Sequence, residues 1–168
     1  ALRNAGRDED FTVLQGHVYG PGMGAAQEYA GAQDALRDLI RQGVQVYIVS
    51  HKTRYPYLGP RHDMHAAAQD WLQQNGFYAP GLFTPDRVFL EPTKEDKLRR
   101  IAALACTHFV DDLPEFLGHP DFPLDVQRLL FAPKGTAAAE MPFVCCDSWK
   151  AVQQHLRAAL ARETVGAV

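Results

Sequence analysis

Two adjacent carboxylates, Asp111 and Asp112, end the short apolar run of residues 107–110. Adjacent aspartates repel each other and lose hydration when they are crowded, so a fold rarely places them at the end of a buried strand without a cation. Carboxylate oxygens are the ligands that hard divalent cations prefer. We expect Asp111 to anchor such a cation. Asp112 and Glu115 lie further out and are weaker candidate ligands. Alternatively, Asp112 caps the next helix and Glu115 interacts with the dipole of that helix.

Two further polar signals lie upstream at comparable positions. Ser50 ends the apolar run 46–49, and Lys94 and Lys97 open the helical pattern that precedes the paired aspartates. A hydroxyl, an ammonium and a carboxylate pair at the ends of α/β elements can together bind a phosphoryl group and a hard divalent metal. Ser50, Lys94 and Lys97 are therefore the candidate catalytic residues. The sequence leaves open which lysine acts, with Lys94 nearer the predicted start of the helix.

A basic cluster follows Ser50 directly. His51, Lys52 and Arg54 carry side chains that bind phosphate, so together with Ser50 they are candidate phosphate or substrate ligands. The alternative for Ser50 is an ordinary turn residue at a strand end, where serine is common.

Hydrophobic periodicity predicts the elements that must position these groups. Helices are expected over residues 25–42, 62–74, 94–105 and 149–160, and strands over 44–49, 87–90, 107–110, 127–131 and 143–145. Residues 1–24 are polar and glycine-rich and are expected to form a loop with one short helix. Short apolar strands that alternate with helices indicate an α/β protein with a mainly parallel sheet covered on both faces.

Composition narrows the classes of function. The chain has 168 residues, which suits one domain, and its formal net charge of −3 gives no electrostatic footprint for nucleic acid. No apolar run has the length of a membrane span, and no signal peptide is visible. Three cysteines without metal-ligand spacing argue against a disulfide framework and for a cytoplasmic location. The oligomeric state stays open.

The segments around Ser50, the lysines and the paired aspartates resemble, in order and spacing, motifs of the haloacid dehalogenase (HAD) superfamily of phosphatases. The likeness covers about residues 28–131, with Ala30-Gly31-Ala32 and Gly43 leading to the serine motif. The resemblance implies a Rossmann-like three-layer α/β/α sandwich over residues 1–168. It also implies phosphoryl transfer through an aspartyl-phosphate with Mg²⁺, and a small phosphorylated metabolite as substrate.

The first motif of this family departs from its pattern. The family nucleophile is the first aspartate of Asp-x-Asp-x-Thr directly after an apolar strand. Asp8 and Asp10 match those letters, but residues 2–7 are not an apolar strand. We interpret the match as coincidental, and the segment as a charged helix start or a solvated turn. The sequence then lacks the central strand of the family. Either the N-terminus has been cut away, or another segment takes the place of this strand. Residues 1–24 are a loop or the remnant of a small cap.

The sequence thus predicts a Mg²⁺-dependent phosphatase of HAD type. The main alternative is a HAD-like module that has lost catalysis and binds a phosphorylated ligand or a protein. A flavodoxin-like receiver domain also uses an acidic pair and a lysine, but its acidic pair comes first along the chain. The predicted site requires Ser50, a lysine and Asp111 to converge at the carboxyl edge of one parallel sheet.

Overall fold

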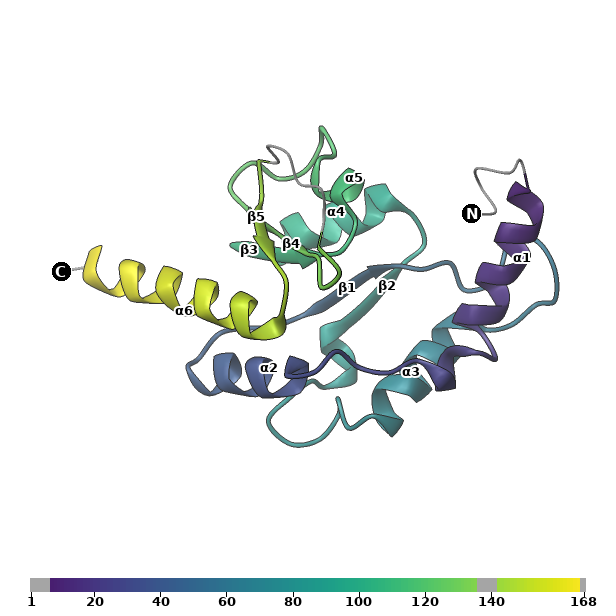
Figure 1. The fold of residues 1–168 in the computed structure, drawn as a ribbon, viewed down its shortest axis with the longest axis horizontal. Helices are drawn as coiled ribbons and strands as arrows, with labels where there is room; N and C mark the ends of the chain where they lie inside the picture. The colour runs from purple at the N-terminus through teal and green to yellow at the C-terminus, as the bar shows by residue number, and fades with distance from the viewer. Residues whose placement is uncertain (1–6, 136–141, 167–168) are drawn as a thin grey trace. The chain divides into compact units, whose positions relative to one another are not determined.

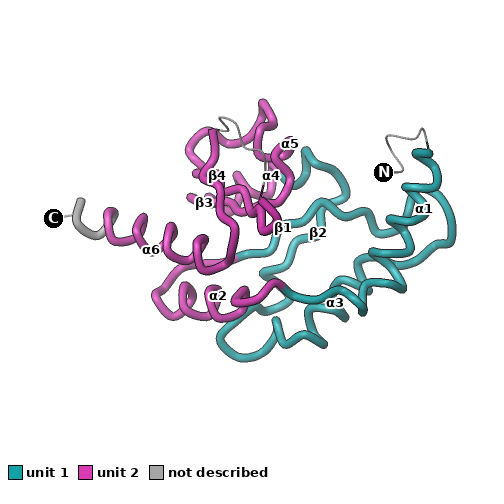
Figure 2. The backbone as a smooth tube through the Cα atoms, in the orientation of Figure 1, with its two compact units in different colours: residues 1–28, 47–97 teal, residues 29–46, 98–168 magenta. Residues whose placement is uncertain are grey.

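Short parallel strands alternate with helices along the chain in the computed structural model shown in Figure 1. The structure describes residues 7–135 and 142–166. The chain divides into two compact units, which Figure 2 colours separately. Unit 1 comprises residues 1–28 and 47–97, and unit 2 comprises residues 29–46 and 98–168.

Unit 1 contains a two-stranded parallel sheet, in which Ile48 of β1 pairs with Val88 of β2. Helix α1 lies against α3 and against the 3₁₀ turn that follows α1. The elements of this unit are α1 (Asp8–Tyr19), the 3₁₀ turn Met23–Ala25, β1 (Ile48–His51), α3 (Met64–Gln74), the 3₁₀ turn Pro85–Arg87 and β2 (Val88–Glu91). Helix α4 (Lys94–Ala103) begins in this unit and crosses into unit 2 at residue 98.

Unit 2 contains a three-stranded parallel sheet in the order β3–β4–β5. The middle strand supplies Leu129, Leu130 and Phe131, which are all buried. Leu129 and Phe131 form one apolar cluster with Cys146 and Val152. The elements of this unit, besides the end of α4, are α2 (Ala32–Arg41), β3 (His108–Asp111), α5 (Pro114–Leu117), β4 (Gln127–Phe131), β5 (Val144–Cys146) and α6 (Trp149–Gly166).

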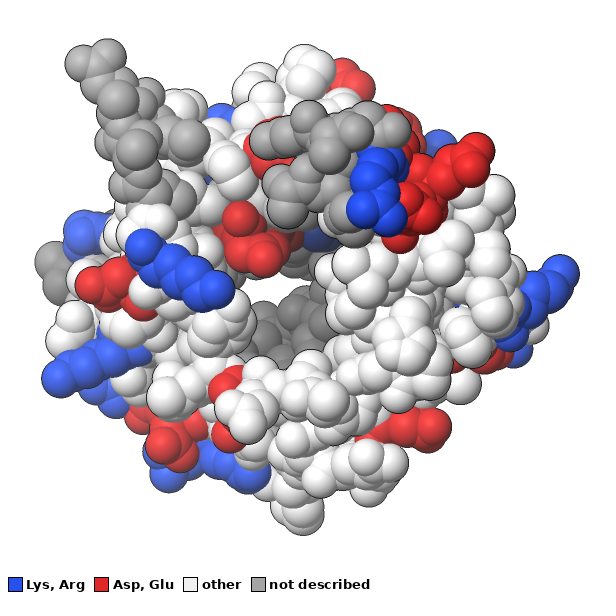
Figure 3. Space-filling model, turned by 45° about the vertical axis from the view of Figure 1, so that its right-hand side comes forward, with Lys and Arg blue, Asp and Glu red and all other residues white. Residues whose placement is uncertain are grey.

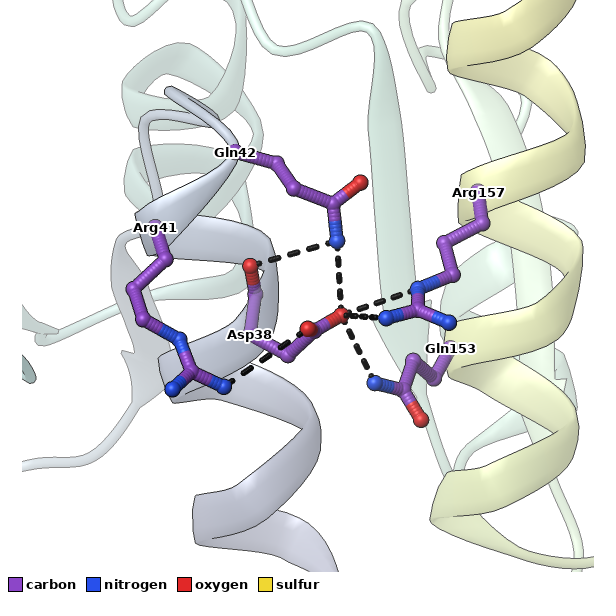
Figure 4. A network of polar contacts seen from close by, with 5 residues as sticks. All are labelled: Asp38, Arg41, Gln42, Gln153 and Arg157. Carbon is purple, nitrogen blue, oxygen red and sulfur yellow. Dashed lines mark hydrogen bonds and ion pairs between the residues drawn. The ribbon is translucent and has the colours of Figure 1, made fainter.

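Asp38 joins α2 to α6 in unit 2, as Figure 4 shows. One of its carboxylate oxygens accepts hydrogen bonds from Gln42 Nε2 (2.7 Å), Gln153 Nε2 (2.8 Å) and Arg157 Nε (2.9 Å). Arg41 lies 3.7 Å from the other oxygen. The hydrogen bond from Gln153, and then the contacts with Arg157 and Arg41, hold the pKa of Asp38 below its ordinary value despite some desolvation.

The sequence predicted most elements, and the clearest differences have local reasons. Helix α2 starts at Ala32 and not at residue 25, because Gly31 precedes it with φ of 78°, a left-handed conformation that favours glycine. Strand β1 starts at Ile48, where the first pairing with β2 occurs, and not at residue 44. Residues 8–19 form a full helix in which Gly16 is buried, so this glycine is not a loop signal.

The α/β class with small parallel sheets interleaved with helices is confirmed. The three cysteines are free, as expected. Within the described ranges, no helix is both long and apolar enough to cross a bilayer. Acidic and basic side chains mingle on the face drawn in Figure 3, in keeping with 17 Lys and Arg against 20 Asp and Glu.

Candidate functional site

The carboxyl ends of β1 and β2 lie side by side in unit 1. Ser50 pairs with Leu90 and His51 with Glu91, and the backbone N–H of Lys52 donates to the carbonyl of Glu91 at 2.8 Å. Because the strands are parallel, everything that follows their last residues emerges at the same edge of the sheet. Ser50 and His51 therefore share this edge with the start of α4.

Helix α4 begins only two residues after β2 ends, and Thr93 caps it. The Thr93 hydroxyl accepts a hydrogen bond from the backbone N–H of Asp96 at 3.0 Å and donates to the Asp96 carboxylate at 2.7 Å. The first intrahelical bond runs from the Lys97 N–H to the Thr93 carbonyl. A capped helix start carries partial positive charge, which favours an anion nearby. Thr93 was not among the predicted site residues, although a threonine three residues before an acidic residue is a recognisable capping signal.

His51 connects the strand edge to the lysines of α4. Partial burial lowers the pKa of His51, and a hydrogen bond to the backbone of Pro92 acts in the opposite direction. Lys94 and Lys97 lower this pKa further, more strongly than Glu95 raises it. Both ammonium groups are therefore within electrostatic range of the His51 ring. The structure places His51 at the end of β1, beside the end of β2, and Lys94 and Lys97 in the first turn of α4, which follows β2 after two residues.

The two lysines differ in environment. Lys94 is exposed, whereas only 6% of Lys97 is accessible. Burying an ammonium is costly unless it is compensated, so the position of Lys97 is the more constrained of the two. Lys94 can meet a ligand from solvent without such a cost.

Lys52 and Arg54 have partners elsewhere in unit 1. The Lys52 Nζ lies 4.1 Å from the centre of the Tyr19 ring, and burial lowers the pKa of Lys52. Arg54 forms an ion pair with Asp63 at 3.0 Å, and Asp63 also caps α3 by accepting from the backbone N–H of Ala66. These contacts tie the loop between β1 and α3 to α1 and α3. Phosphate binding by Lys52 or Arg54 stays a prediction.

Asp111 ends β3 in unit 2, and its Oδ1 accepts a hydrogen bond from the backbone N–H of Leu113 at 3.0 Å. This is a local turn that aspartate commonly forms. Leu113, and not Asp112, occupies the N-cap position of α5, so the capping interpretation of Asp112 was wrong. Asp112 and Glu115 are both exposed. Pro114 occupies the first turn of α5 as expected.

The metal site stays a prediction. Within residues 7–135 and 142–166, no three His, Cys, Asp or Glu side chains gather closely enough to hold a metal ion. Mg²⁺ keeps several waters and needs few protein ligands, and its preference for carboxylate oxygen fits the chemistry of Asp111.

Asp8 and Asp10 lie in the first turn of α1, where Asp10 accepts from Arg7 Nε at 2.6 Å. The interpretation of this segment as a charged helix start is confirmed. Both residues lie within a helix, whereas a nucleophile motif requires a position at the end of a strand.

The convergence of Ser50, a lysine and Asp111 also stays a prediction, because the first two lie in unit 1 and Asp111 lies in unit 2. Among the described residues, β1 pairs with β2 and β3 pairs with β4. The expected absence of a central strand stays a prediction as well, because β1 and β3 belong to different units.

Comparisons with protein families, with curated protein sequences and with solved structures found no match to this chain. The fold defines the class, an α/β protein with small parallel sheets interleaved with helices. Because the comparisons give no activity, the proposal below rests on the residues at the edge where β1 and β2 end.

Proposed function

We propose that this protein is a Mg²⁺-dependent phosphatase of HAD type that acts on a small phosphorylated metabolite. The observation that supports this most directly is that Ser50 and His51 end β1 beside the end of β2, from which the capped start of α4 with Lys94 and Lys97 follows after two residues. Two cations, a hydroxyl-bearing strand end and a helix start are the groups that hold a phosphate dianion in α/β proteins. A cytoplasmic location belongs to the same proposal and fits the three free cysteines.

Each group at this edge has a distinct role in the proposal. The Ser50 hydroxyl donates to a phosphate oxygen, and the ammonium of Lys94 or Lys97 neutralises charge that develops in the transition state. The first backbone N–H groups of α4 point toward the same anion. Burial and the two lysines disfavour the charged form of His51 when the site is empty. Lys52 and Arg54 act further out, on the remainder of the substrate.

Asp111 is the residue proposed to hold Mg²⁺, with Asp112 and Glu115 acting through water. Bound Mg²⁺ would supply a Lewis acid that polarises the phosphoryl oxygens. The nucleophile is assigned to neither Asp8 nor Asp10, because both lie in the first turn of α1.

That helical position of Asp8 and Asp10 favours a second candidate function. A HAD-like module that binds a phosphorylated ligand or a protein without hydrolysing it needs the phosphate site but no attacking carboxylate. The two candidates share the edge of β1 and β2 and differ only in chemistry, so binding and hydrolysis must be tested separately.

Binding is tested by titrating inorganic phosphate while the His51 ring protons are followed by NMR. A bound dianion favours the charged imidazole, so phosphate should raise the pKa of His51. Lys94→Ala should raise the pKa of His51 in the absence of phosphate, because it removes a neighbouring positive charge, and should weaken phosphate binding by about tenfold. Lys150→Ala, which changes an exposed lysine of α6, is the control. Phosphate binding that is unaffected by both Ser50→Ala and Lys94→Ala would refute the site.

Hydrolysis is tested with p-nitrophenyl phosphate and Mg²⁺. Release of nitrophenol that depends on Lys94 and Asp111 supports the phosphatase. Phosphate binding without hydrolysis supports the binding module. Activity in this chain that disappears in Asp8→Asn would show that our interpretation of that motif is wrong.

A further inference from the structure

Lys52 extends strand β1 by one residue beyond His51. Its backbone N–H donates to the carbonyl of Glu91 at 2.8 Å, which continues the parallel pairing of His51 with Glu91. The carbonyl of Lys52 accepts a hydrogen bond from His65 Nε2 at 2.7 Å, so its backbone is fixed on both sides. Successive side chains of a strand alternate between the two faces of the sheet. Lys52 therefore stands on the same face as Ser50.

The Lys52 ammonium lies against an aromatic ring. Its Nζ is 4.1 Å from the centre of the ring of Tyr19, the last residue of α1. This cation–π contact holds the ammonium in place, but the face of the ring offers no oxygen to which its N–H groups can donate. Lys52 is half-buried and Tyr19 is 43% accessible, so this part of unit 1 is open to solvent.

No carboxylate neutralises the Lys52 ammonium within residues 7–135 and 142–166. Burial lowers the pKa of Lys52, and no acidic group among these residues raises it. Arg54 shows the contrast, because Asp63 pairs with its guanidinium at 3.0 Å. A partly buried ammonium without a counterion is costly, and an anion that binds there removes part of this cost. The single positive charge of Lys52 matches a single negative charge, which a carboxylate carries and a phosphate dianion exceeds.

We propose that Lys52 binds a carboxylate of the substrate, so that the substrate class is a short phosphorylated carboxylic acid. The phosphoryl group is held at Ser50, and two residues along a strand are about 6.6 Å apart. A chain of a few carbon atoms can therefore place its two anionic ends at the two sites. This inference rests on the proposed function, because it takes the phosphate site at Ser50 as given. It assigns Lys52 a role in specificity and none in the chemical step.

The test compares two ligands that differ only in the second anion. 3-Phosphoglycerate carries a carboxylate where glycerol 3-phosphate carries a neutral hydroxymethyl group. Calorimetric titration without Mg²⁺, so that neither ligand is hydrolysed, should give a dissociation constant at least about tenfold lower for 3-phosphoglycerate. Lys52→Met keeps the length of the side chain but not its charge, so this preference should disappear while glycerol 3-phosphate still binds. Lys150→Met, which removes the charge of an exposed lysine of α6, is the matched control and should keep the preference.

Lys52→Glu adds a reversal of the charge. Its carboxylate repels that of 3-phosphoglycerate, so glycerol 3-phosphate should become the tighter ligand, and circular dichroism checks that the variant folds. Equal affinity of the wild-type chain for the two ligands would overturn the inference, and so would a preference for 3-phosphoglycerate that survives Lys52→Met and Lys52→Glu. Both results leave the phosphate site at Ser50 intact, because both ligands still bind. A chain that binds neither ligand nor inorganic phosphate would instead refute the proposed function, and this inference with it.

Discussion

Leu129→Ala should destabilise unit 2 strongly, because Leu129 occupies the middle of its sheet. This side chain is fully buried, and its backbone pairs with β3 at Val110 and with β5 at Val144. At about 0.8 kcal/mol for each buried carbon, loss of its three outer carbons costs about 2.4 kcal/mol. Strands on both sides limit collapse around the cavity, which adds to this cost, so we expect about 3–4 kcal/mol in total.

The effect can be followed through one tryptophan. Trp149 packs against the same apolar cluster, and its ring lies 5.6 Å from that of Phe131. The other tryptophan of the chain, Trp71, stacks on Phe77 in unit 1 and can be replaced by phenylalanine to leave Trp149 as the single fluorophore. Urea unfolding in this background then reports on the surroundings of β4.

Leu124→Ala is the matched control, because the same atoms are removed from a side chain that is 90% accessible. Its free energy of unfolding should stay within about 0.5 kcal/mol of the parent value. A loss below about 1 kcal/mol in Leu129→Ala would refute the reasoning, because it would mean that β4 is not packed as described. Since domains are stable by only about 5–15 kcal/mol, the expected loss should also be visible as a lower thermal midpoint.

Three further changes test local features of the fold. Thr93→Ala removes the hydroxyl that caps α4 and should cost about 1 kcal/mol in urea unfolding, and an unchanged midpoint would contradict the cap. Asp38 has a lowered pKa in the folded protein, so its contribution to stability is present above the ordinary carboxyl pKa and is lost as the pH falls through the lowered value. Unfolding measured over a series of acidic pH values should therefore depend less on pH in Asp38→Asn, and identical profiles would refute its role. Gly16→Ala should destabilise unit 1 although alanine favours helices by about 1 kcal/mol, because the new methyl group meets the rigid Pro56 ring. Gly24→Ala, with open space around it, is the control, and equal stability of the two variants would show that α1 and its loop are not in close contact.

The order and type of the elements could be predicted from the sequence because they depend on local periodicity. Strand β4 coincides with its predicted range of 127–131, and Asn75 and Gly76 end α3 as expected. The predicted boundaries were wrong where a single backbone conformation or a distant partner decides where an element begins. Gly31 delays the start of α2 through its positive φ, and β1 begins only where β2 is present to pair with it.

In the candidate site, too, some features follow from the local sequence and others depend on distant partners. Ser50 and the lysines could be found because their types and their places at element ends are visible in the sequence. The electrostatic effect of both lysines on the pKa of His51 depends on the register between β1 and β2, which no local pattern encodes. The contact of Lys52 with Tyr19 joins residues that are 33 positions apart, so a local pattern could not predict it either.

The pairing of α2 with α6 has a consequence for the order in which this chain is made. Arg157 is synthesised 119 residues after its partner Asp38. A ribosome therefore releases α2 long before the helix that packs against it exists, so the apolar side of α2 must wait until α6 emerges. We expect nascent chains that end before residue 149 to expose this side and to be bound by chaperones or cleaved. Chains that reach α6 should escape both.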